Sequence, residues 1–153
     1  MASTSTSVTV HHGHFDSQSR KSPTLAFLEK YALAIDSLDL SSTPCTSFFA
    51  PLAVYHDTSG NIHIGASAIW SYISRQFAPF SQIRHDVVEA RVIEEEGGRE
   101  VVYGETLAHF KLRGDEDEIV VPRFFVWTVG RSGEGEGTDG KVLLEQRLFW
   151  DTG

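Results

Sequence analysis

The chain has 153 residues, of which 41% are hydrophobic and 22% are charged, a balance typical of a single globular domain. Its net charge is −8 and its basic residues are scattered, so neither nucleic acid nor an anionic membrane is an expected partner. A single cysteine, Cys45, excludes an intrachain disulfide, and no apolar run reaches the length of a membrane span. The N-terminus lacks the basic and apolar regions of a secretory signal, so the expected location is the cytoplasm.

Residues 1–22 are polar and show no apolar periodicity, which predicts a flexible tail ahead of one domain over residues 23–153. This tail should be dispensable for folding. Three histidines in it, His11, His12 and His14, form a candidate metal cluster. A mobile polar tail is the alternative, because metal ligands need a preorganised frame, and no metal site is assigned.

The first half of the domain reads as helical with one short hairpin. Ser22 and Pro23 are typical of a helix start, and apolar residues at helical spacing extend the predicted helix over residues 23–38. A helical turn follows over 46–49. Short strands are expected at 53–56 and 62–64, and a second helix at 66–77, ended by Pro79.

The second half changes to long segments rich in Val, Phe and Tyr. Four strands are predicted at 83–93, 100–112, 119–129 and 142–150, separated by turn sequences. Consecutive long strands joined by hairpins form an antiparallel meander, and helices followed by a sheet indicate an α+β domain. The glycine-rich stretch at 133–137 lacks the Lys-Ser/Thr ending of a phosphate-binding loop.

Three local patterns carry a resemblance to a known fold. They are AIDSLD at 34–39 with FAP at 49–51 and VYH at 54–56, GASAI at 65–69, and the C-terminal hairpin from DGKV at 139–142 to FWD at 149–151. With this element order, the chain resembles the cone-shaped nuclear-transport-factor-two-like fold over about residues 22–152. Within it, the sequence is similar to SnoaL-like polyketide cyclases and, more loosely, to scytalone dehydratases. The resemblance implies a curved antiparallel sheet packed on N-terminal helices around a small-molecule pocket.

The dehydratase resemblance also implies candidate catalytic residues. Asp36 matches an acidic residue near the end of the first helix, and His85 matches a catalytic histidine at the start of a long strand. His109 lies near a second histidine of those enzymes. The dehydratases also use a pair of tyrosines to hold a water molecule. The nearest positions in this sequence are occupied by Ile35 and Asp57, and Tyr55 could take the place of such a tyrosine.

The residue chemistry leaves several alternatives open. A histidine on a strand is also typical of the protein surface, or of a core in which its ring is hydrogen-bonded. Asp36 could simply face water at a helix end. Strand alternation places His85 with Glu89 on one face. It also places Tyr103 with His109, but it does not say which faces are concave. The candidate substrate-binding residues are Tyr55, Trp70, Tyr103, Arg123 and Phe125. Trp70 also fits the core, and Arg123 could pair with a buried acid or anchor a substrate oxygen.

A histidine that titrates near neutrality, with an aspartate to orient it, can take and return a proton. The sequence therefore predicts an isomerase, cyclase or dehydratase that acts on a polyketide-like or terpenoid-like molecule by His/Asp acid–base chemistry, without a cofactor. The alternative is a non-catalytic small-molecule-binding or protein-interaction module of the same fold. Apolar residues on both faces of the long strands predict a homodimer through the outer face of the sheet.

Overall fold

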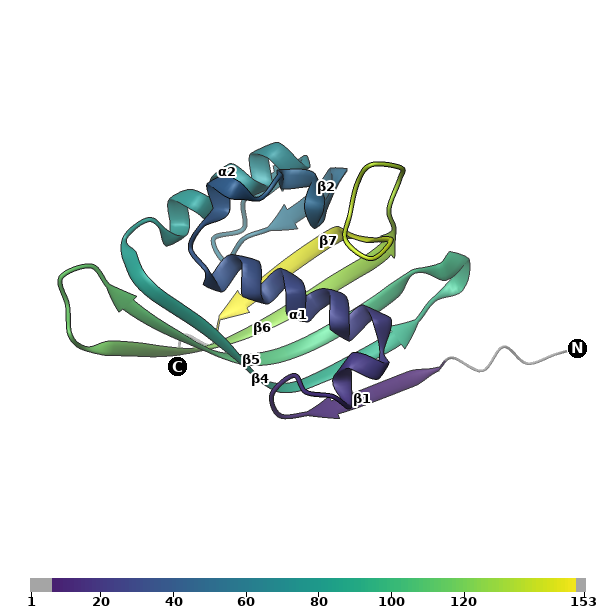
Figure 1. Ribbon diagram of the computed structural model, residues 1–153, viewed down its shortest axis with the longest axis horizontal. Helices are drawn as coiled ribbons and strands as arrows, with labels where there is room; N and C mark the ends of the chain where they lie inside the picture. The colour runs from purple at the N-terminus through teal and green to yellow at the C-terminus, as the bar shows by residue number, and fades with distance from the viewer. Residues whose placement is uncertain (1–6, 151–153) are drawn as a thin grey trace, which may run out of the picture.

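The computed structural model describes residues 7–150 as two helices packed on one large curved sheet (Figure 1). The helices are α1 (Pro23–Asp36) and α2 (Ala66–Phe77). The strands are β1 (Val8–His12), β2 (Phe49–His56), β3 (Ile62–Ile64), β4 (Phe80–Glu94), β5 (Glu100–Leu112), β6 (Glu118–Arg131) and β7 (Lys141–Trp150). The predicted second helix and the second of the four long segments thus have the expected limits, and the α+β class is confirmed.

The seven strands lie in the order β1-β4-β5-β6-β7-β2-β3. The predicted meander of β4 to β7 is antiparallel throughout, but β2 pairs with β7 in parallel, so the sheet is mixed rather than wholly antiparallel. A hairpin forces its two strands to be antiparallel. No hairpin joins β2 to β7, which are separated by most of the chain, so this pair is free of that constraint.

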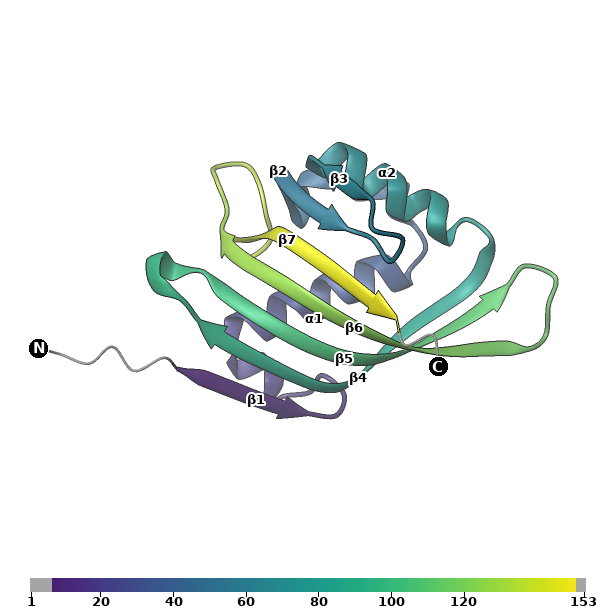
Figure 2. The same ribbon diagram turned by 180° about the vertical axis from the view of Figure 1, so that it is seen from behind.

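Helix α1 lies along one face of the sheet, and α2 lies beside β2 and β3 (Figures 1 and 2). We call the sheet face toward α1 the inner face. Its buried side chains alternate along the strands, as with Val102, Thr106 and Phe110 on β5. The buried core of the domain lies between this face and the apolar side of α1.

Helix α1 ends two residues earlier than predicted. The Ser22 hydroxyl caps its start by accepting the Leu25 N–H, with Pro23 at the first helical position. At the other end, the Ser37 hydroxyl donates to the Ala34 carbonyl, and Leu38 takes a left-handed conformation with φ of 57°. Asp36 is therefore the last residue of the helix.

The expected flexible tail is wrong for the residues that the structure describes. Strand β1 pairs with β4 over five residue pairs, from Val8 with Ile93 to His12 with Glu89. Phe15 then packs against the core, and Asp16 accepts backbone N–H groups in the next turn. An edge strand pairs through backbone hydrogen bonds. It can therefore form without the apolar periodicity by which the sequence analysis recognised strands. Residues 1–6 lie outside the described part of the chain.

Removing residues 1–20 should therefore destabilise the domain. Losing the partly buried Phe15 alone removes about 1–2 kcal/mol of apolar burial, which for a domain of this length corresponds to a fall in melting temperature of roughly 2–8 °C. Loss of the β1 pairing adds to that fall. Val10→Ala, at an exposed position on β1, is the control and should change little. Calorimetry that finds the same melting temperature for the shortened chain would restore the flexible-tail interpretation.

The outer face of the sheet carries three half-exposed aromatic rings in a row. Tyr103, Phe124 and Phe149 have neighbouring ring centroids 6.4 and 6.3 Å apart and are 39–50% exposed. Contiguous exposed apolar surface of this kind is typical of an interaction site, so the homodimer remains our prediction.

Light scattering at micromolar concentration should give twice the 17.0 kDa of one chain. Placing a charge in the centre of the aromatic row, with Phe124→Lys, should return the mass of one chain, because each subunit would bury an unpaired charge. Ile62→Lys, on the exposed short strand β3, is the matched control. A monomeric wild type would contradict the prediction.

Candidate functional site

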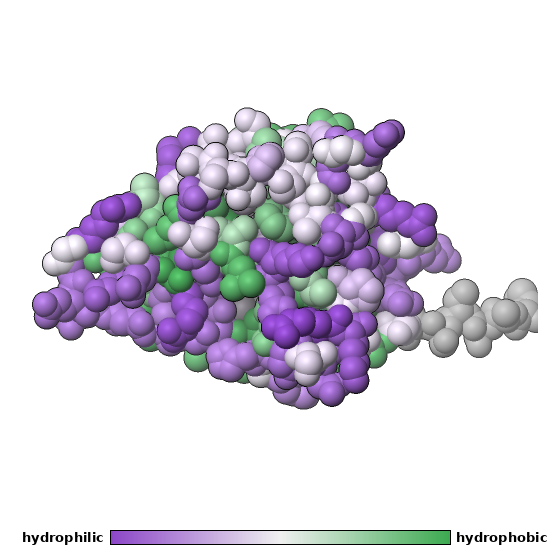
Figure 3. Space-filling model, in the orientation of Figure 1, coloured by the Kyte–Doolittle hydropathy of each residue, from purple (hydrophilic) through white to green (hydrophobic). Residues whose placement is uncertain are grey.

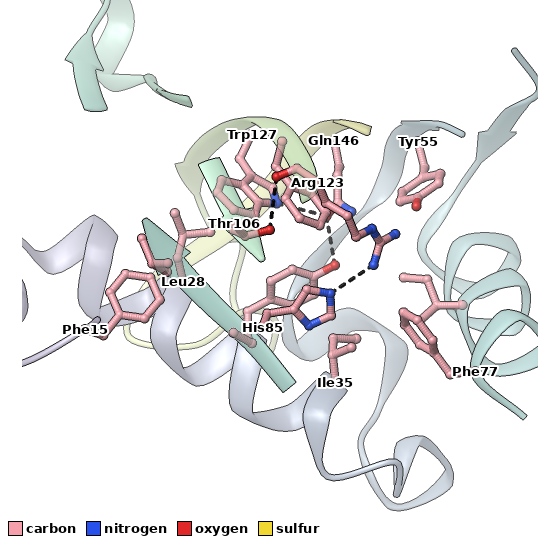
Figure 4. Close-up of a pocket in the computed structure, with 15 residues that line it drawn as sticks. Phe15, Leu28, Ile35, Tyr55, Phe77, His85, Thr106, Arg123, Trp127 and Gln146 are labelled. Carbon is pink, nitrogen blue, oxygen red and sulfur yellow. Dashed lines mark hydrogen bonds between the residues drawn. The ribbon is translucent and has the colours of Figure 1, made fainter. Parts of the chain in front are cut away.

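A cavity lies between α1 and the inner face of the sheet, and Figure 4 shows the side chains around it. Its empty space is about 570 Å³ with the open mouth included. Its apolar lining is Phe15, Leu28, Ala32, Ile35, Ile73, Phe77, Val87, Phe125 and Trp127. Its polar lining is Tyr31, Tyr55, His85, Thr106, Arg123 and Gln146.

Asp36 holds His85 in this cavity by two hydrogen bonds from one carboxylate. The backbone N–H of His85 donates to Oδ2 at 3.0 Å, and the ring Nδ1 lies 2.8 Å from Oδ1. The backbone bond is available because β1 pairs with β4 only from Glu89 onward, which leaves the edge of β4 free beside His85. The last residue of α1 thus takes the place of a neighbouring strand.

The second ring nitrogen of His85 fixes the tautomer. Arg123 Nη1 lies 2.9 Å from Nε2, and a guanidinium can only donate, so Nε2 accepts and Nδ1 carries the proton that is donated to Asp36. The His85 side chain is only 10% exposed. Burial lowers the pKa of His85 below the usual 6.5, against the opposing effect of Asp36, and the Arg123 charge lowers it further. His85 is therefore a neutral base at pH 7.

Arg123 is buried among aromatic rings rather than beside an acid. Its guanidinium carbon lies 5.2–5.9 Å from the ring centroids of Phe77, Phe110, Phe125 and Trp150. Among residues 7–150, no carboxylate makes a salt bridge to it, and its Nε has no hydrogen-bond partner. Burial lowers the pKa of Arg123, but an arginine still stays charged at neutral pH.

The rear of the cavity is fixed by Gln146. Its side-chain oxygen accepts from the Tyr31 hydroxyl at 2.8 Å and from the Trp127 indole N–H at 3.1 Å. Trp127 stacks on Phe125 with centroids 4.8 Å apart, and its ring lies directly over Gly104. A Cβ at position 104 would come within 2.5 Å of that ring, so glycine is what lets the indole lie flat against β5.

Four of the residues that the sequence analysis selected line the cavity: His85, Arg123, Phe125 and Tyr55. Asp36 lies directly behind His85 rather than on the cavity wall. Burial raises the pKa of Tyr55 to about 12, so its hydroxyl stays protonated and can donate a hydrogen bond.

Three other candidates lie elsewhere. Trp70 is in the core, where its indole N–H donates to the Leu40 carbonyl at 2.9 Å. Tyr103 and His109 are on the outer face of β5, since the inner positions of that strand are the even-numbered ones. His109 instead lies between two acids there, 2.6 Å from Glu118 and 2.9 Å from Asp86. His109 therefore does not meet His85 in the cavity.

A bulge in β4 explains why the predicted grouping of His85 with Glu89 is also wrong. The register with β5 shifts between Val87 and Glu89, which inserts one extra residue. His85 and Val87 face the cavity, whereas Glu89 faces outward and pairs with Arg91. The sequence analysis missed the wall residues Tyr31, Thr106, Trp127 and Gln146. For Thr106 a signal existed, because Val102, Ala108 and Phe110 form the more apolar of the two β5 faces.

The described residues show neither a metal-like cluster nor a membrane-spanning helix. Within residues 7–150, no three His, Cys, Asp or Glu side chains gather as metal ligands do. Nor is either helix in that range both long and apolar enough to cross a bilayer.

No protein-family model and no curated protein matches the sequence, but solved structures match its fold. Aln2 from a Streptomyces species is 17% identical, with a TM-score of 0.70 over 90% of this chain and 94% of that one. A candidate scytalone dehydratase from Novosphingobium aromaticivorans is 11% identical, with a TM-score of 0.67 over 88% of both chains. Nuclear transport factor 2 from Cryptosporidium parvum is 11% identical, with a TM-score of 0.65 over 90% of this chain and 98% of that one.

These likenesses define the class of fold. The chain has the α+β cone of the nuclear-transport-factor-two-like or SnoaL-like proteins, as its sequence patterns predicted. At such identities the likeness extends to the fold alone, so the chemistry of the site rests on the residues of this chain.

Nitrogen NMR of the histidine rings should find His85 as the Nδ1–H tautomer with a pKa below 6.5, because burial opposes the charged ring. Asp36→Asn should lower this pKa further, since the carboxylate is the group that favours the protonated ring. His56 is an internal reference on β2, and its signal should not move with the Asp36 change. A His85 pKa above 6.5 would contradict the assignment.

Proposed function

We propose that the protein is an enzyme that moves a proton on a small, largely apolar molecule, with His85 as the general acid and base. The observation that carries this proposal is the chain of contacts from Asp36 through His85 to Arg123 at an apolar cavity. A neutral imidazole oriented by a carboxylate has a basic nitrogen ready, and the apolar surroundings strengthen its electrostatic contacts.

The chemistry that fits these groups begins at a C–H bond beside a carbonyl. His85 Nε2 takes the proton, the C–H electron pair moves toward the carbonyl to form an enolate, and Arg123 stabilises the developing oxygen charge. Returning the proton to another carbon completes an isomerisation. Loss of a hydroxyl at the next carbon, protonated by His85 as it leaves as water, completes a dehydration. Attack of the enolate carbon on a second carbonyl of the same molecule, with the proton returned from His85 to the new alkoxide, completes a cyclisation.

Arg123 and Tyr55 supply the donors that this chemistry needs. The guanidinium lies 2.9 Å from the base, so an oxygen held by it places an adjacent carbon near Nε2. Tyr55 lines the same cavity and remains a neutral donor at pH 7. A substrate of the polyketide or terpenoid kind follows from the sequence resemblance, and the likeness to a candidate scytalone dehydratase agrees with it at the level of fold.

A non-catalytic ligand-binding or interaction module is the second candidate, and two observations favour it. Phe125 and Trp127 stack on each other in the cavity wall, so much of that wall is aromatic. The row of Tyr103, Phe124 and Phe149 lies outside, on the opposite face of the sheet. Under this interpretation His85 and Arg123 would bind a ligand without moving a proton.

Hydrogen–deuterium exchange at the carbon beside the carbonyl of 1-tetralone, followed by proton NMR in D₂O, distinguishes the two candidates. The wild type should accelerate this exchange over buffer, and His85→Gln should lower the acceleration about a hundred- to ten-thousand-fold. His109→Gln, which changes a histidine outside the cavity, should keep the wild-type rate. Equal rates for the wild type and His85→Gln would favour the binding module.

A further inference from the structure

A second cavity lies on the far side of Arg123 from the first. It opens where the C-terminal end of α2 faces the start of β6 and the end of β7, and its empty space is about 830 Å³ with the open mouth included. Figure 3 shows apolar side chains gathered at the surface in this region. Phe80, Phe110 and Leu148 are among its walls. We call it the outer cavity, and the cavity beside His85 the inner cavity.

Arg123 belongs to the wall between the two cavities. Of the described residues, four line both cavities: Tyr55, Ile73, Phe77 and Arg123. In Figure 4, the Arg123 side chain extends between His85 and Phe77 toward Tyr55. Its guanidinium is the one charged group of this shared wall, so an anionic group in either cavity can reach it.

A counter-ion for Arg123 is missing among the described residues. The side chain is 7% exposed, yet its direct hydrogen-bond partner there is the neutral Nε2 of His85, and its Nε is unpartnered. Asp36 lies one imidazole ring away and is already bonded to His85. A buried charge without a paired acid is costly, and aromatic rings compensate only part of that cost. A negatively charged oxygen would complete the site.

We propose that Arg123 binds an anionic oxygen of a ligand that spans both cavities, and that this contact releases His85 Nε2. The inference rests on the proposed function, whose substrate it narrows to a flat apolar molecule carrying a carboxylate, phenolate or enolate oxygen. The anion draws the guanidinium away from the imidazole, and the apolar body occupies the outer cavity among Phe80, Phe110 and Trp150. An anionic ligand therefore frees the base more fully than a neutral ligand does.

The charges around His85 predict in which direction its pKa changes when an anion binds to Arg123. In the free protein, Asp36 on α1 and Asp86 on β4 favour a protonated ring, whereas Arg123 on β6 opposes it. Burial, the largest effect, still lowers the pKa of His85, but a bound anion cancels the additional lowering by Arg123. The pKa of His85 should then rise when an anionic ligand binds, whereas a neutral ligand of the same shape should leave it unchanged.

Titration calorimetry with 2-naphthoate and with 2-naphthamide at neutral pH tests the anchor, because the two probes share a shape and differ in charge. The wild type should bind naphthoate at least about ten-fold more tightly than naphthamide. Arg123→Gln should bind both equally, whereas Arg123→Lys should keep part of the preference. Arg147→Gln removes an exposed arginine of β7 and should behave as the wild type.

Histidine NMR of the wild type supplies a second measurement that needs no substitution. Naphthoate should raise the pKa of His85, and naphthamide should not. Equal affinities of the wild type for the two probes, a preference that survives Arg123→Gln in a folded protein, or an unmoved His85 pKa would overturn the inference. If these binding measurements fail but 1-tetralone exchanges in a His85-dependent way, this inference is wrong and the proposed function stands. An Arg123-dependent preference without exchange would leave a binding site and refute the catalysis.

Discussion

The carboxylate of Asp36 is the contact on which the arrangement of the site depends. It accepts both the backbone and the ring N–H of His85, and so it fixes helix α1 against the free edge of β4. The same two bonds set the direction of the imidazole and its tautomer, which in turn makes Nε2 the acceptor for Arg123. A single acid at a helix end thus organises two elements and a chain of three side chains.

This dependence explains why the secondary structure around the site has its particular limits. The helix ends at residue 36, where Ser37 bonds back to the last turn and Leu38 leaves the helical conformation, so the Asp36 carboxylate reaches His85 from the last turn. Strand β1 must stop at His12, because a longer β1 would occupy the edge of β4 that Asp36 uses. The bulge after Val87 then shifts the inward and outward alternation of the later β4 residues by one position. The site is therefore built from interruptions of regular structure.

Much of the fold was predictable, because helix spacing, proline positions and long β-rich segments are local signals. The pair of Asp36 and His85 came from the resemblance, since they lie 49 residues apart and meet only through tertiary packing. Strand faces were harder to predict. The bulge in β4 reversed the grouping of His85 with Glu89, and both β5 faces carry apolar residues, so Tyr103 and His109 were assigned to the cavity although they lie outside it. Strand β1 was missed because backbone pairing at an edge leaves no apolar pattern.

Gly104 shows that the depth of the cavity is set partly by a residue with no side chain. Trp127 lies flat on β5 only because no Cβ stands there, and the indole then forms the rear wall together with Phe125. An alanine at that position would add no atom that a ligand touches, but it would tilt the indole inward and shorten the space before Arg123. Ligand size in this protein can therefore drift by substitution beneath the binding surface, while the acid, the base and the cation stay unchanged.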